Sequence, residues 1–229
     1  MGKFFDMDSP IMRFLNRVGD LLILNMLMIA CCIPIITVGA AFTAMHYVLL
    51  KIVRDEEGYL VRGFFKSFVR NFKQATLIWL LMLLVIGVYV GDAFIFNYSG
   101  ITFPKALVIA VIAIGVIVLM VMTYIFPLLA RFDNTIKHTI KNAALLAFAN
   151  LPKTVLMVFI YALPFIMVYF SAYTYIFIIM FGISLPAYGA AWVYSGIFKK
   201  FEPESEQVSD IDFSVNVEQG EEESNGEAE

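Results

Sequence analysis

Long apolar stretches alternate with short basic segments along the first 200 residues of the chain. A helix of about 20 residues crosses a bilayer whose hydrocarbon core is about 30 Å thick. Four of the stretches have this length, so the pattern predicts membrane helices over about 75–97, 105–130, 153–172 and 174–198.

The first apolar stretch, residues 18–50, is too long for one such helix and is interrupted at Pro34. Proline removes a helix donor and pushes the preceding residue toward an extended conformation. Thr37 is a suitable cap for a new helix. We therefore expect a hairpin of two helices, about 10–32 and 38–54, and six membrane helices in all. The alternative is five, with one long kinked helix at the start.

Composition supports a membrane domain followed by a separate tail. The chain is 61% hydrophobic, whereas soluble domains contain about 45–50% apolar residues. Residues 1–200 hold all 16 Lys and Arg and only eight acidic residues, while residues 201–229 hold eleven acidic residues and no Lys or Arg. The fold expected is an all-α polytopic helix bundle over 1–200, and an acidic disordered tail over 201–229.

The basic residues predict an orientation for this bundle. Residues 51–73 contain six Lys or Arg and residues 131–153 contain four, whereas 92–105 contain only Lys105 and 171–176 contain none. Basic residues also precede the first apolar stretch and follow the last one. Cytoplasmic loops are enriched in Lys and Arg, so we expect both chain ends in the cytoplasm of a multi-pass cell-membrane protein.

The two basic connectors are expected to be amphipathic surface helices, about 60–73 and 134–148. Aromatic or small apolar residues on one face and cations on the other are typical of helices in the headgroup layer. In the first connector the residues expected at the acyl boundary are Phe64, Phe65, Phe68 and Phe72. The alternative is a helix packed against the bundle. The cations expected to contact lipid headgroups or a partner are Arg62, Lys66, Arg70, Lys73, Lys137 and Lys141.

Catalytic signatures are absent from the sequence: it has no phosphate-binding glycine loop, dinucleotide motif or metalloprotease motif. We expect no enzyme and assign no catalytic, cofactor-binding or metal-binding residues. Among intramembrane polar residues, Asn25 is expected to bridge helices rather than bind substrate, and His46 to pack rather than carry protons. Asp133 is expected to cap the following helix, with Arg131 at the headgroups; the alternative is a docking ledge for a cytoplasmic partner.

Three stretches together resemble the YesL family of uncharacterised bacterial membrane proteins. They are residues 25–51, 63–75 and 126–150, and the similarity extends over about 4–200. The candidate structural motif residues within them are Pro34, Thr37, Gly39, Pro127, Arg131, Asp133 and Asn134.

This resemblance implies an accessory role beside carbohydrate ABC transporters or their sensing systems. The partners it implies, besides the lipid bilayer, are ABC sugar transporter subunits or a sensor kinase; no nucleic acid and no cofactor are expected. The alternative function is a small permease that acts alone or as a homo-oligomer. Gly87 and Gly91 permit close helix approach, within the chain or between copies.

Overall fold

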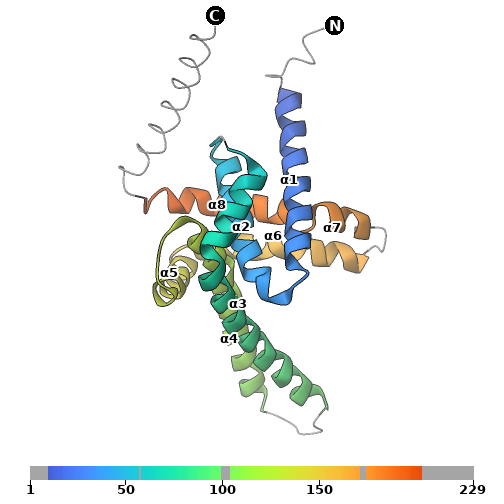
Figure 1. The fold of residues 1–229 in the computed structure, drawn as a ribbon. Helices are drawn as coiled ribbons and strands as arrows, with labels where there is room; N and C mark the ends of the chain where they lie inside the picture. The colour runs from blue at the N-terminus through green and yellow to red at the C-terminus, as the bar shows by residue number, and fades with distance from the viewer. Residues whose placement is uncertain (1–9, 57, 99–103, 171–173, 203–229) are drawn as a thin grey trace, which may run out of the picture.

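The structure, a computed structural model, describes residues 10–56, 58–98, 104–170 and 174–202, and all regular structure in these ranges is helical (Figure 1). The elements are α1 (Pro10–Cys32), η2 (Ile35–Thr37), α2 (Val38–Val53), α3 (Leu60–Tyr98), α4 (Lys105–Arg131), α5 (Ile136–Ala149), α6 (Leu151–Phe170), α7 (Tyr175–Phe181) and α8 (Ser184–Phe198). Within the described ranges, five segments are long and apolar enough to cross a membrane, and α7 with α8 forms a sixth if the pair is one span. The chain is an all-helical multi-pass membrane protein, as expected.

Helix α2 lies at the centre of the fold. Ten of its 16 residues are buried, and it packs against α1, α3, α4 and α8. Its first turns carry Gly39, Ala40 and Ala41, whose small side chains let neighbouring backbones approach closely. Phe42 then stacks on Phe126 of α4, with the ring centroids 5.7 Å apart.

Helices α1 and α2 form a hairpin rather than one kinked helix. The chain breaks at Pro34, and the two helices pack against each other. Thr37 is the N-cap residue of α2, but the capping bond expected from its side chain is not made. Its hydroxyl instead faces the backbone carbonyl oxygens of Cys31 and, at 2.7 Å, Pro34. Cys31 lies at the end of α1, where carbonyl groups lack partners within the helix, and Pro34 lies in the turn that follows.

Helix α3 is a single helix of 39 residues, where we expected a surface helix and a separate membrane helix. It is about 58 Å long at 1.5 Å per residue, so it must tilt strongly or extend beyond the hydrocarbon layer. Phe64 is fully buried, and Phe68 and Phe72 pack against the core; only Phe65 among the four is exposed. The expectation of an acyl-boundary position is therefore wrong for Phe64, and the burial of this face fits the alternative of a helix packed against the bundle.

Helices α7 and α8 are bent by 51° at a short break, where we expected one continuous helix. Asn25 of α1 is fully buried against this break. Its side-chain amide donates to the Ile179 carbonyl oxygen (2.7 Å), and its Oδ1 accepts from the backbone N–H groups of Ile183 (3.1 Å) and Ser184 (2.9 Å). Asn25 thus bonds to backbone N–H and carbonyl groups around the break between α7 and α8. This is the bridging role predicted for it.

Two hairpins, α3–α4 and α6–α7, project from the central region in different directions (Figure 1). Their outer halves expose large apolar side chains, including Leu84, Val88, Phe94, Ile109, Ile112, Phe165 and Ile176. Exposed apolar surface of this extent belongs against lipid or another apolar surface. Gly87 and Gly91 have no atom within 4 Å of an added Cβ, so this pair is not used for packing among the described residues.

We expect substitution Gly39→Ala to destabilise the fold. An added Cβ would lie 2.5 Å from the Ala75 carbonyl oxygen and 2.6 Å from the Trp79 Cβ, both fixed to the α3 backbone. Overpacking of this kind typically costs about 1–3 kcal/mol. The control is Gly63→Ala at the same helix pair, where the nearest atom lies at 3.8 Å and a gain of up to about 1 kcal/mol is expected. Equal unfolding temperatures of the two variants in detergent would contradict this account of the α2–α3 contact.

Candidate functional site: the Arg54–Glu202–Arg131 network

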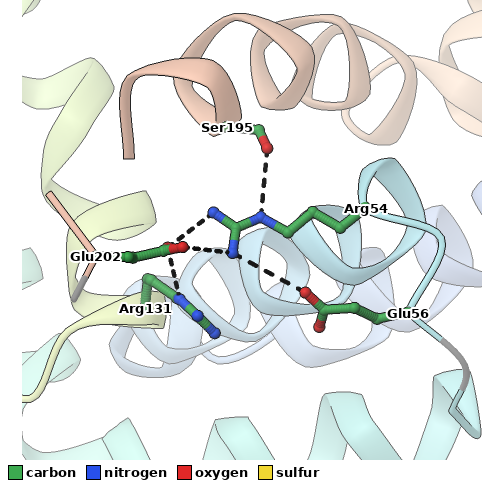
Figure 2. A network of polar contacts seen from close by, with 5 residues as sticks. All are labelled: Arg54, Glu56, Arg131, Ser195 and Glu202. Atoms are coloured by element: carbon green, nitrogen blue, oxygen red, sulfur yellow. Dashed lines mark hydrogen bonds and ion pairs between the residues drawn. The ribbon is translucent and has the colours of Figure 1, made fainter. Parts of the chain in front are cut away.

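A buried carboxylate joins the ends of three helices (Figure 2). Glu202, four residues after α8, accepts two hydrogen bonds from the Arg54 guanidinium, at 3.0 and 2.8 Å. Arg131 Nε donates to the same carboxylate at 2.8 Å. The side chains of Glu202 and Arg54 are only 1% and 8% exposed, and that of Arg131 is 18% exposed.

The local backbone places each member of this network. Arg54 is the C-cap residue of α2, and Arg131 is the last residue of α4. Both cations therefore lie at helix C-termini, where the helix dipole favours positive charge. The chain turns after α8, and the Glu202 backbone N–H bonds to the Phe198 carbonyl oxygen at 3.2 Å, which directs the carboxylate toward both arginines.

Two further oxygen atoms lie beside Arg54 (Figure 2). Arg54 Nε donates to the Ser195 hydroxyl at 3.4 Å, and the Glu56 carboxylate lies 3.9 Å from Nη1. Arg54 thus contacts both Ser195 within α8 and Glu202, four residues after the end of α8.

The electrostatics favour the charged carboxylate. Burial by itself raises the pKa of Glu202, but the hydrogen bonds and charges of Arg54, and then of Arg131, lower it further than burial raises it. The net pKa lies below its ordinary value, so Glu202 is ionised at neutral pH. With Glu56 beside Arg54, the network holds two carboxylates and two guanidinium groups, so its formal charges balance.

Two predicted motif residues have partners other than those expected. Arg131 binds Glu202 rather than only extending to the headgroups. Asp133 does not cap α5, whose N-cap residue is Thr135 without a side-chain cap bond. The Asp133 carboxylate instead pairs with Arg70 of α3 at 2.5 Å, which links the two basic connectors directly. Beside it, the Asn134 carbonyl accepts a hydrogen bond from Gln74.

The remaining predicted residues divide into exposed and buried sets. The exposed cations are Arg62, Lys66, Arg70, Lys73, Lys137 and Lys141. Pro34 is exposed in the α1–α2 turn, while Gly39 and Pro127 are buried. His46 is also buried, and its Nδ1 lies 3.1 Å from the Tyr194 hydroxyl of α8. This places His46 in the contact between α2 and α8, as a packing residue would be.

Sequence reasoning missed Arg54, Ser195 and Glu202 as a group. An arginine at the end of an apolar helix is ordinary, and Glu202 was assigned to the tail. No short motif connects residues that lie 71 and 148 positions apart in the chain. Glu202 belongs to the folded domain, whereas residues 203–229, the rest of the expected tail, lie outside the described residues.

The network can hold an anion but offers little for covalent chemistry. Arginine matches carboxylate and phosphate geometry through paired N–H donors and stays charged. Within the described residues, no group of three or more His, Cys, Asp and Glu side chains is placed to hold a metal ion. The arrangement therefore supports attachment of an acidic segment.

Residues 21–93 match a protein family described as "Protein of unknown function, DUF624". The matched segment runs from α1 through most of α3 and includes Arg54, but ends before Arg131 and Glu202. No curated protein and no solved structure matches the chain.

We expect Glu202→Gln to destabilise the protein at neutral pH by roughly 3 kcal/mol, because it removes the carboxylate that pairs with both partly buried arginines and leaves the more distant Glu56 beside Arg54. The matched control is Asp133→Asn. Its pair with Arg70 is exposed on both sides, and exposed pairs contribute about 0–1 kcal/mol. Unfolding by denaturant in detergent micelles measures both.

The same comparison has a defined pH dependence. Because the folded pKa of Glu202 lies below its ordinary value of 4.5, its contribution is complete above that value and is lost as the pH falls through the folded pKa. The stability difference between wild type and Glu202→Gln should therefore be constant near neutrality and shrink below pH 4.5. A difference that grows on acidification would show that the carboxylate is not stabilised in its charged form.

Proposed function

We propose that the protein is a non-enzymatic accessory component of a membrane complex. In this proposal the basic end of the molecule faces the cytoplasm and contacts the partner. This end comprises the start of α1, the α2–α3 turn, α5 and the end of α8. Carbohydrate ABC transporter subunits, or the sensor of such a transporter, are the partners proposed.

The observation that carries the proposal is the attachment of Glu202. Arg54 and Arg131 form a clamp that fixes Glu202, the residue directly before the segment 203–229, against the helical domain. That segment carries ten further acidic residues and no Lys or Arg. An acidic segment that starts at a fixed point on a basic surface is suited to engage a partner's cations without a catalytic centre.

The carbohydrate link depends on sequence similarity. DUF624, matched over residues 21–93, is the family that includes YesL-like proteins. The resemblance to YesL supports the association with carbohydrate uptake, and it is an association rather than a mechanism.

The proposed orientation predicts a pattern of cysteine labelling. In a background with Cys31 and Cys32 replaced by serine, Lys66→Cys on α3 and Lys3→Cys should resist a membrane-impermeant thiol reagent in intact cells. Lys105→Cys, at the opposite end of the molecule, should react. Ready labelling at position 3 with position 66 protected would instead place the N-terminus outside the cell. The protein would then have five membrane helices rather than six.

The proposed partnership predicts a specific co-purification. The full chain, isolated from native membranes after in-cell crosslinking, should carry subunits of a carbohydrate ABC transporter or a sensor kinase. Truncation after Glu202 should reduce their yield, because it removes the acidic segment and keeps the clamp. The control is Asp92→Asn, which removes one acidic charge in the second half of α3, away from the basic end, and should leave the yield unchanged.

Reconstitution of the protein alone separates this function from its main alternative. Proteoliposomes that contain only this chain should show no specific sugar uptake. Specific uptake would establish a small permease and overturn the accessory role.

A further inference from the structure

A groove of about 740 Å³ opens between α1 and the α7–α8 pair. Its walls are mostly apolar and consist of Phe14, Val18 and Leu21 from α1, and Phe177, Phe181 and Leu185 from α7 and α8. The volume lies in the range of small-molecule sites, about 300–1,000 Å³. The groove lies apart from the Glu202 network and was not anticipated from the sequence.

The same groove is lined by two cations and a hydroxyl. Arg13 and Arg17 lie one helical turn apart on α1, and the Tyr188 hydroxyl accepts a hydrogen bond from Arg17 at 3.0 Å. On α1 the two arginines alternate with Phe14 and Val18, and Leu21 continues the apolar lining one turn after Arg17. A ligand that binds both the arginines and the apolar residues of the groove needs an anionic group joined to apolar chains.

We propose that this groove binds one anionic phospholipid, with its phosphate at Arg13 and Arg17 and an acyl chain along Phe177, Phe181 and Leu185. Guanidinium groups bind phosphate oxygens through paired hydrogen bonds. A soluble anion would leave the apolar walls in water, and the two arginines attract an anionic headgroup more strongly than a headgroup without net charge. Both α1 and the α7–α8 pair are candidate membrane spans, so the groove is open to lipid.

Two acidic side chains among the described residues, Asp55 and Asp20, interact with Arg17. Asp55 pairs with Arg17, but its side chain is 76% exposed, and exposed pairs are weakly held and exchange readily. Asp20 lies on α1 beyond Arg17 and is not part of the groove lining. A phosphate can therefore share Arg17 with Asp55 or displace it.

Native mass spectrometry of the full chain in detergent, titrated with phosphatidylglycerol or phosphatidylcholine, tests the proposal. We expect one tightly bound phosphatidylglycerol and weaker phosphatidylcholine binding. The double variant Arg13→Gln/Arg17→Gln should lower the affinity for phosphatidylglycerol roughly thirtyfold, which corresponds to about 1 kcal/mol per cation. The matched control, Lys199→Gln/Lys200→Gln, removes two exposed cations outside the groove and should leave the affinity unchanged.

A second variant removes the ambiguity that Arg17 also ties α1 to Asp55 and Tyr188. Val18→Trp keeps both arginines and fills the groove, so it should abolish tight phosphatidylglycerol binding without lowering the unfolding temperature. Unchanged binding in this variant would show that the lipid lies elsewhere.

Three other results would overturn the proposal. Equal affinities for the two lipids would show that the groove does not select an anionic headgroup. Displacement of the lipid by glycerol 3-phosphate would identify a soluble anion as the ligand. Lipid binding that occurs only after deletion of residues 1–9 would show that the chain's own N-terminal segment is the occupant. A dimer in the same spectra that the double variant dissociates would assign the groove to a second copy.

Discussion

The burial of α2 on all sides is the constraint on which the fold depends. Small residues in its first turns, Gly39, Ala40 and Ala41, let the neighbouring helices approach it closely. The approach to α3 is close enough that no Cβ fits at Gly39. In a bilayer, helix association relies on such packing because lipid chains are as apolar as the side chains they replace. The positions of α1, α3, α4 and α8 all follow from this contact.

Polar contacts between helices then fix the relative positions that apolar packing leaves variable. Asn25 ties α1 to the α7–α8 break, His46 meets Tyr194 between α2 and α8, and Glu202 draws together the ends of α2, α4 and α8. Each contact joins segments distant in sequence, and each lies where an unpaired polar group would be costly. Packing sets the distances between helices, while these contacts set their registers and their angles.

The sequence predicted the positions of individual helices well but did not predict which helices and side chains contact one another. Pro34 marked the break between α1 and α2 because its effect on the backbone is local. The continuity of α3 was missed because its basic first part is typical of the headgroup layer and its apolar second part of the membrane interior. No glycine or proline interrupts residues 64–86, and this was the signal for a single helix. Glu202 was missed for a different reason. Its partners lie on two other helices, and only the folded chain brings the three together.

The tight contact with Gly39 of α2 divides the long α3 unequally. This contact, at Ala75, lies 15 residues from Leu60 and 23 residues from Tyr98. If α3 pivots about that point as a rigid rod, its two ends move in opposite directions, and the far tip moves about 1.5 times as far as the basic end, because helical rise is constant per residue. The pair between Arg70 and Asp133 lies on the short arm. In that geometry a displacement at the pair would be smaller than the accompanying displacement at the far tip.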